Sequence, residues 1–97
     1  MQFEWDEAKN RHAFRQRGFG FDYAARIFGD LTLEKQDDRR DYGEIRMQAI
    51  GRVGNDILFV VYTDRGDFRH IISARRASRK ERRLWHSFAE RWITSNG

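Results

Sequence analysis

Six basic residues lie within nine positions of the chain, in the segment 75–83. They are Arg75, Arg76, Arg79, Lys80, Arg82 and Arg83. We expect this segment to join the end of a strand to the start of a helix, where free N–H groups and the helix dipole already favour anions. Cations at that end oppose the dipole, and this destabilising arrangement indicates a function, namely phosphate binding. The alternative is a solvated basic face that Glu81 partly offsets.

A second group of polar residues alternates along two expected strands, 44–51 and 68–75. On the first strand they are Glu44, Arg46 and Gln48, and on the second Arg69, Ser73 and Arg75. If the two faces coincide, the uncovered side of the sheet is a floor of arginines into which Tyr62 points. Such a surface matches RNA, because arginines bind phosphates and tyrosine stacks on bases. The alternative is that any sheet covered on one side shows polar residues to water.

The candidates for acid–base chemistry are few. His70 alternates with Phe68 and Ile72, so simple register places it on the apolar face, although one bulge would reverse that placement. His12 and His86 fall on expected helices and are more typical of surface histidines. No H-x-x-x-H spacing is present, which gives no sign of a metal site. The chain has no cysteine, which excludes disulfides, thiolate zinc sites and a cysteine nucleophile.

Length and charge narrow the class of protein. The 97 residues support one domain, and Lys+Arg exceeds Asp+Glu by 19 to 15. Only three of the basic residues are lysine, so sixteen are arginine. Residues 1–48 have a net charge of −1 and residues 49–97 of +5, which indicates an anionic partner. No apolar stretch approaches the ~20 residues of a membrane span, and no secretory signal is evident, so we expect a cytoplasmic protein.

Hydrophobic periodicity and capping residues predict the order β-α-α-β-β-β-β-α. The expected strands are 3–5, 31–35, 44–51, 56–63 and 68–74. The expected helices are 7–17, a short helix that Asp22 caps and that ends at Phe28, and 79–93. Asp6 and Gly18 match the two ends of the first helix, and Ser78 with Glu81 matches a capping box. Meander connections favour an α+β fold with an antiparallel sheet of four to five strands and helices mainly on one face. We expect one domain over 1–93 and a frayed tail over 94–97.

These residues, taken in three blocks, resemble the BrnT family of type II toxins. The blocks are Phe3-Glu4-Trp5-Asp6 with Lys9; Gly18, Phe21, Ala24, Ala25, Phe28 and Asp30; and Ile50-Gly51 through Val60-Val61-Tyr62-Thr63 to Arg65-Gly66-Asp67 and the string from Ile71 to Arg82. The resemblance covers roughly residues 1–85. The chain departs from the family pattern at Ala13, Gln16 and Arg17, so any role of those family side chains does not carry over. Where the family often has an arginine before the Ile-Ile-Ser-Ala-Arg string, this chain has His70.

The resemblance implies a RelE-like fold and a ribonuclease that blocks translation. It also implies neutralisation by a BrnA antitoxin, which resembles a ribbon-helix-helix DNA-binding protein, in a complex that represses its own operon. Operator DNA would then be contacted through the antitoxin. Composition and spacing alone show only a small α+β domain with an arginine-rich surface, which agrees with this family.

The chemistry we expect is cleavage of RNA without a metal or another cofactor. The ribose 2′-hydroxyl would attack the adjacent phosphate, which needs a base, cations and a proton donor. Arg75 and Arg79 are the expected charge-stabilising residues, and Glu44 or His70 the base. The expected RNA-binding residues are Arg76, Lys80, Arg46, Arg69 and Tyr62.

Two alternatives stay open on the sequence. In the first, the same surface binds RNA or an acidic partner without cutting it. In the second, the arginine face serves only to dock the antitoxin. Mere binding would weaken steeply with salt and leave no new RNA ends.

Overall fold

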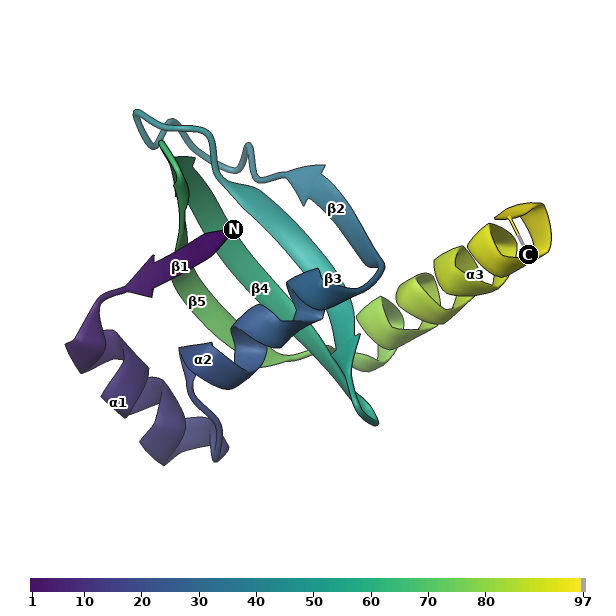
Figure 1. The fold of residues 1–97 in the computed structure, drawn as a ribbon, viewed down its shortest axis with the longest axis horizontal. Helices are drawn as coiled ribbons and strands as arrows, with labels where there is room; N and C mark the ends of the chain where they lie inside the picture. Colours follow the sequence, from purple (N-terminus) through teal and green to yellow (C-terminus); the bar gives the residue numbers. More distant parts are fainter. Residues whose placement is uncertain (97) are drawn as a thin grey trace.

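Five strands form one sheet in the order β1-β5-β4-β3-β2 (Figure 1). The computed structural model describes residues 1–96. Its elements are β1 (Gln2–Trp5), α1 (Glu7–Arg17), α2 (Phe21–Ala24), the 3-10 helix η1 (Ala25–Gly29), β2 (Thr32–Gln36), β3 (Met47–Val53), β4 (Asp56–Arg65), β5 (Phe68–Arg76) and α3 (Arg79–Asn96). The α+β class and the order of elements are confirmed.

The sheet is mixed, which corrects the expectation of a purely antiparallel one. Strands β2 to β5 form an antiparallel meander, as expected. Strand β1 adds to the edge of β5 in parallel, with Gln2 opposite Phe68 and Trp5 opposite Ile71. This pairing joins the N-terminal strand to a strand more than sixty residues later, and no local pattern in either segment specifies it.

The first helix begins and ends where its capping residues predict. The side chain of Asp6 accepts the N–H of Lys9 at 3.0 Å, which satisfies a free donor of the first turn. Gly18 ends the helix with a φ of 81°, a left-handed conformation that glycine adopts without a Cβ clash. The second helix begins at Phe21 rather than after Asp22, because the side chain of Asn10 accepts the Phe21 N–H at 2.7 Å.

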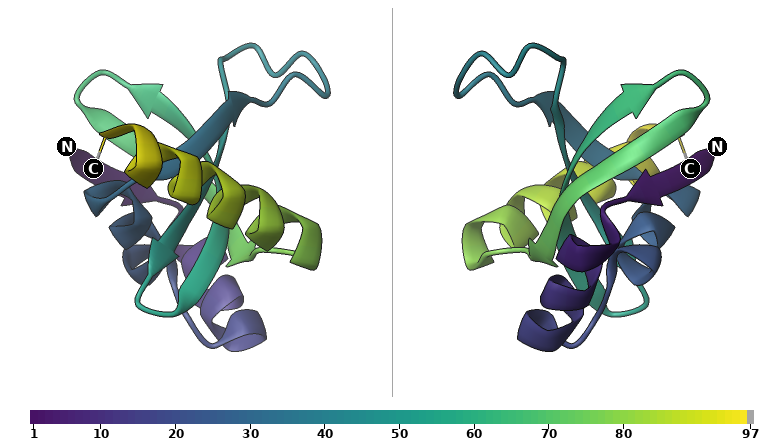
Figure 2. Two further views of the ribbon diagram at one scale, coloured as in Figure 1. Left: turned by 90° about the vertical axis from the view of Figure 1, so that its right-hand side faces the viewer. Right: turned by 90° about the vertical axis from the view of Figure 1, so that its left-hand side faces the viewer.

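Helices lie on both sides of the sheet. Helices α1, α2 and η1 cover one side, here called the first face, around the fully buried Ile27, Leu58, Val60 and Ile71. Helix α3 lies on the opposite side, where Trp85 and Ala89 pack with Ile50 and Ile57. In Figure 2, α3 lies in front of the sheet in the left view, and α1 lies in front in the right view. The expectation of helices mainly on one face therefore holds for α1, α2 and η1 but not for α3.

The side of the sheet that carries α3 is called the α3 face. It bears alternate residues of β4, namely Ile57, Phe59, Val61, Thr63 and Arg65. Helix α3 covers only the end of this face that is near β2 and β3, and then projects beyond the sheet (Figure 1). Beyond the part that α3 covers, Val61 and Thr63 are buried and Arg65 is exposed.

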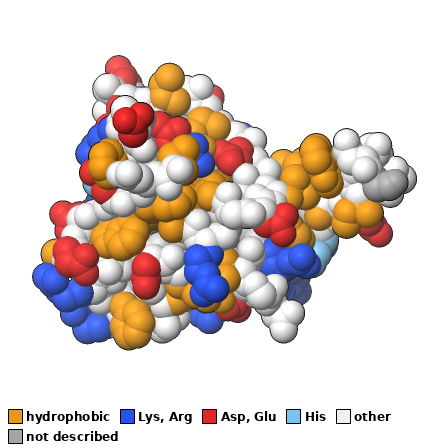
Figure 3. All heavy atoms as spheres, in the orientation of Figure 1, with side chains coloured by type: hydrophobic (Ala, Val, Ile, Leu, Met, Phe, Trp, Pro, Cys, Tyr) orange, Lys and Arg blue, Asp and Glu red, His pale blue; other side chains and the backbone are white. Residues whose placement is uncertain are grey.

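The far half of α3 packs on little. Trp92 is 49% exposed and Ile93 65%, and apolar side chains are visible along the projecting helix in Figure 3. The expected tail 94–97 is helical as far as Asn96, and Gly97 lies outside the described residues. Among the described residues, no helix combines the length and the apolar character that crossing a bilayer requires.

A bulge in β5 changes which residues share a face. Val61 pairs with Ser73 but Tyr62 pairs with Ile71, so Ile72 is an extra residue in β5. Paired residues of antiparallel strands point to the same side, so Ser73 and His70 lie on the α3 face with Val61 and Thr63. The single arginine floor is therefore wrong: Arg75 points to the α3 face and Arg69 to the first face.

The strand expected over 44–51 begins later, at Met47. In a strand over 44–51, Ile45 would alternate with Glu44 and Arg46 and face the core, but it is 65% exposed. Residues 37–46 form instead a loop between β2 and β3, called here the β2–β3 loop. It closes where the N–H of Asp37 donates to the carbonyl of Arg46 at 2.7 Å. Glu44 and Arg46 thus belong to a loop and not to a strand.

We expect Gly51→Ala to destabilise the protein by about 1–3 kcal/mol, because overpacking a dense core forces its neighbours to shift. A Cβ at position 51 would lie 2.7 Å from Cβ of Ile27 and 3.0 Å from Cγ2 of Thr32. Urea denaturation measures the loss. The matched control is Gly29→Ala, whose added Cβ meets nothing within 4 Å. Equal stability of the two variants would contradict the close packing of η1 on β3.

Candidate active site

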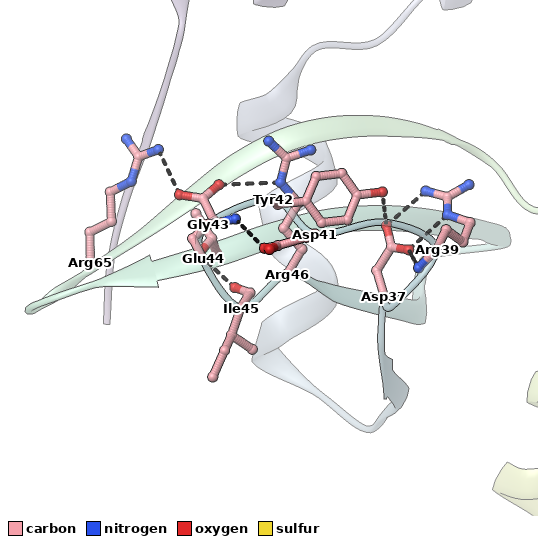
Figure 4. A network of polar contacts seen from close by, with 10 residues as sticks. Asp37, Arg39, Asp41, Tyr42, Gly43, Glu44, Ile45, Arg46 and Arg65 are labelled. Atoms are coloured by element: carbon pink, nitrogen blue, oxygen red, sulfur yellow. Dashed lines mark hydrogen bonds and ion pairs between the residues drawn. The ribbon is translucent and has the colours of Figure 1, made fainter.

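A carboxylate between two arginines lies at the open end of the α3 face (Figure 4). Arg46 Nε donates to Glu44 Oε2 at 3.2 Å, and an Nη of Arg65 donates to Glu44 Oε1 at 3.4 Å. The Glu44 side chain is 27% exposed, so a ligand can reach it. A carboxylate that accepts protons, with two cations beside it, provides two of the groups that phosphodiester cleavage needs.

The environment of Glu44 holds it in the ionised form. Burial raises the pKa of the carboxyl, but the hydrogen bonds from Arg46 and Arg65 and their positive charges outweigh burial, so the pKa is lowered overall. An ionised carboxylate can accept a proton at neutral pH. Its low pKa makes it a weak base for as long as the arginines remain bound to it.

Two backbone contacts fix the loop that carries Glu44. The hydroxyl of Thr63 on β4 donates to the carbonyl of Ile45 at 2.7 Å, and Asp37 and Arg46 close the base of the loop. Thr63 is 2% exposed, so its hydroxyl anchors the loop to the sheet away from water. Arg65 reaches the same place because it follows Thr63 by two residues on one face of β4.

The bulge places His70 on the same face as this cluster. His70 is opposite Thr63 in the sheet, and its neighbour on β1 is Glu4. His70 Nδ1 lies 3.4 Å from Glu4 Oε1, yet within residues 1–96 this buried nitrogen has no hydrogen-bond partner. The side chain is 20% exposed. Glu44 and His70, the two expected bases, thus approach the same end of the α3 face from different elements.

Arg75 lies on the α3 face at its other end and is already paired. Its two Nη atoms donate to the two carboxylate oxygens of Glu81 at 2.8 and 3.0 Å. Its guanidinium carbon lies 4.1 Å from the centre of the Phe59 ring. The capping box is confirmed, since Glu81 also accepts the N–H of Ser78 at 2.7 Å and Ser78 Oγ accepts the N–H of Glu81. The pair therefore fixes the start of α3 to the sheet.

The structure does not bring the expected catalytic residues together around one phosphate. Arg75 is opposite Phe59, whereas Glu44 binds Arg65, six residues further along β4. Six residues of strand span ~20 Å, which separates the two ends of the face. The first turns of α3 carry exposed basic side chains that make no ion pair within residues 1–96. They are Arg79, Lys80, Arg82 and Arg83.

Three expected RNA-binding residues lie on the first face instead. Arg69 packs on the rings of Tyr62 and Phe28, and its guanidinium binds Asp64 at 2.8 Å. Tyr62 is 4% exposed and donates its hydroxyl to Glu34, so it belongs to the core and not to an RNA-facing surface. Arg76 donates to the carbonyl of Arg17 at 3.1 Å. The bulge at position 72 accounts for the placement of Arg69.

The comparisons with known proteins bear on this geometry. A family model described as "Ribonuclease toxin, BrnT, of type II toxin-antitoxin system" matches residues 5–81. The chain belongs to this family. A comparison with curated proteins found no match. The BrnT match spans Glu44, Arg46, Arg65 and His70, and it assigns the chain to the ribonuclease toxins of type II systems.

Two residues of the site in this BrnT chain were not expected from the sequence. Arg65 lies two residues beyond the expected strand 56–63, and continued alternation from Phe59 would have placed it on the α3 face. Thr63 was included in that run as a strand residue without a role of its own. In residues 1–96, no group of three or more His, Asp or Glu side chains comes close enough to hold a metal ion.

We expect Glu81→Gln to reduce the free energy of unfolding by about 1–3 kcal/mol at neutral pH, through loss of the charged pair with Arg75 and a weaker cap. Hydrogen bonds from Arg75 lower the pKa of Glu81 to about 2 from an ordinary 4.5. Because the folded-state pKa is lowered, this stabilisation is present above pH 4.5 and is lost as the pH falls toward 2.

Urea denaturation of the wild type and of Glu81→Gln across this pH range measures the difference. Glu90→Gln, at an exposed position further along α3, is the control and should stay within about 0.5 kcal/mol of the wild type. A gap between wild type and Glu81→Gln that does not narrow in acid would contradict the ion pair.

Proposed function

We propose that this BrnT chain cleaves single-stranded RNA without a metal and thereby inhibits translation. The observation that carries the proposal is the Glu44 carboxylate held between Arg46 and Arg65 at the open end of the α3 face. Family membership supports the substrate class.

The proposed reaction is attack by a ribose 2′-hydroxyl on the adjacent phosphorus. Glu44 takes the hydroxyl proton as the new oxygen–phosphorus bond forms and the bond to the 5′-oxygen breaks. That leaving oxygen takes up a proton, which His70 on the same face can supply. The products are a 2′,3′-cyclic phosphate and a 5′-hydroxyl, and Arg46 and Arg65 neutralise the charge that develops on phosphorus oxygens.

Approach of the substrate would itself activate the base. A phosphate is a strong acceptor for arginine and competes with Glu44 for Arg65. As Arg65 turns to the phosphate, the carboxylate loses one of the partners that lower its pKa and becomes a stronger base. The ion pairs of the free protein are then a resting arrangement.

The exposed cations of α3 have a separate role in this proposal. Arg79 and Lys80, in the first turn of α3, bind phosphates at the end of the face where Arg75 lies, away from Glu44. Arg75 also binds a phosphate when that phosphate displaces Glu81 from its guanidinium. RNA stretched along the α3 face would therefore be held at one end and cut at the other.

The proposed partner is a BrnA-like antitoxin of the ribbon-helix-helix type. By covering the α3 face it would block RNA, and it would carry the toxin to operator DNA through its own DNA-binding part. The second candidate function is a non-catalytic RNA-binding or antitoxin-binding module. The pairing of Glu44 with two arginines favours it, because a paired carboxylate is a weak base.

We expect induced expression of the chain to arrest growth and to reduce incorporation of labelled amino acids. New RNA 5′ ends bearing a hydroxyl should accumulate, because the proposed cleavage leaves that end. Co-expression of a BrnA-like antitoxin should relieve the arrest. Soluble, folded protein that causes neither arrest nor new 5′ ends would support the binding module and contradict the ribonuclease.

We expect Glu44→Gln to slow cleavage of purified RNA by about 10²- to 10⁴-fold, the usual contribution of a general base. The assay contains a metal chelator, in which the wild type should remain active. Asp38→Asn is the matched control, because Asp38 is an exposed acid of the same loop.

Folding of both variants is checked by thermal unfolding, and RNA binding by fluorescence anisotropy. The expected pattern is unchanged binding with lost cleavage for Glu44→Gln only. Cleavage at the wild-type rate by folded Glu44→Gln would contradict the assignment of the base.

A further inference from the structure

The β2–β3 loop contains a stacked pair, Tyr42 and Arg46, and the proposed reaction does not use its aromatic member. The guanidinium carbon of Arg46 lies 4.0 Å from the centre of the Tyr42 ring, a close cation–π contact. One edge of the same guanidinium donates to Glu44. The Tyr42 ring therefore holds Arg46 at one face of the guanidinium, and the Glu44 carboxylate holds it at one edge. The Arg46 side chain is 28% exposed. The pair therefore offers a flat, supported surface to a ligand.

A buried carboxylate anchors this pair. The Asp37 side chain is 0% exposed, and Arg39 binds both of its oxygens at 2.7 Å. The hydroxyl of Tyr42 lies 3.4 Å from Oδ2 of Asp37, which directs the ring toward the base of the loop. Figure 4 shows the resulting chain of contacts from Arg39 through Tyr42 to Glu44 and Arg65. The loop is thus ordered before any ligand binds.

The charge of the loop indicates which part of an RNA it can accept. Residues 37–46 contain four acidic residues (37, 38, 41 and 44) and three arginines (39, 40 and 46), a net charge of −1. This net charge gives the loop as a whole no attraction for a phosphate backbone, apart from the single contact proposed for Arg46. Bases, in contrast, stack on aromatic rings and guanidinium planes through their uncharged faces. The chemistry of the loop therefore matches a nucleobase.

We propose that Tyr42 and Arg46 form a nucleobase subsite, in which an RNA base stacks on the Arg46 guanidinium and Tyr42 supports it from the other side. The inference rests on the proposed function and deepens it. Because Arg46 also binds Glu44, the stacked base belongs to the nucleotide whose 2′-hydroxyl Glu44 deprotonates. Tyr42 is thus a positioning residue, which brings the ribose to the base through Arg46.

The test measures the binding of a short single-stranded RNA that carries a 2′-deoxynucleotide at the mapped cleavage position, which prevents cutting. A series of such RNAs replaces the base at each position in turn by an abasic site. The wild type should bind about 5- to 100-fold more weakly when the base at the cleavage position is missing, as for the loss of one stacked base. Tyr42→Leu should bind both RNAs equally weakly.

Tyr42→Phe is the matched control, because it keeps the ring under Arg46 and removes only the hydroxyl. It should retain the wild-type difference between the two RNAs. Thermal unfolding verifies that all variants are folded. If Tyr42→Phe also bound the intact and the abasic RNA equally, a general collapse of the loop would explain the result for Tyr42→Leu. That outcome would contradict the subsite.

The remaining outcomes separate this inference from the proposed function. If the wild type cuts RNA but binds every abasic RNA as well as the intact one, the subsite is wrong and the ribonuclease stands. If Tyr42→Leu keeps the wild-type difference, the subsite is likewise wrong. If the wild type does not cut RNA, the proposed reaction fails, but the abasic series still tests the subsite. A single position at which loss of the base weakens binding to the wild type but not to Tyr42→Leu supports the subsite. If no position shows this behaviour, the subsite is wrong.

Discussion

The register between β4 and β5 decides which side chains can meet on the α3 face. One extra residue, Ile72, reverses the alternation of β5 halfway along the strand. On the C-terminal side of Ile72, Ser73 and Arg75 point to the α3 face. On its N-terminal side, His70 points to the α3 face and Arg69 to the first face. A regular strand would have placed Arg69 beside the β2–β3 loop and buried His70. The placement of His70, the proposed proton donor, on the same face as Glu44 therefore depends on a single extra residue in β5.

The abundance of arginine is a poor guide to the RNA-binding surface, because the fold uses several arginines to cover aromatic rings. Arg69 lies 4.0 Å from the Tyr62 ring centre, and Arg75 lies at 4.1 Å from that of Phe59. Both also bind a carboxylate, so their charges are largely neutralised within the protein. Arg79 and Lys80 contribute little to packing, which leaves their charges available to an anionic ligand.

Local features of the fold could be predicted from the sequence, and features that join distant segments could not. Helix α1 follows from Asp6 and Gly18, and the start of α3 follows from Ser78 and Glu81, because capping depends on neighbours three or four residues away. The parallel pairing of β1 with β5 depends on contacts across more than sixty residues. Glu44 and His70 were predicted one by one as candidate bases, but their meeting at one end of the α3 face was not predicted. A loop positions Glu44 and a bulge positions His70, and hydrophobic periodicity indicates neither feature.

The position of α1 also bears on the departures from the family pattern at Ala13, Gln16 and Arg17. Ala13 packs into the core of the first face, and the Arg17 carbonyl accepts a hydrogen bond from Arg76. All three positions are on a helix that the sheet separates from the α3 face. A ligand held by the β2–β3 loop cannot touch them directly. Substitutions on α1 can therefore change the stability of the sheet or a second surface, but the groups proposed for catalysis remain in place without them.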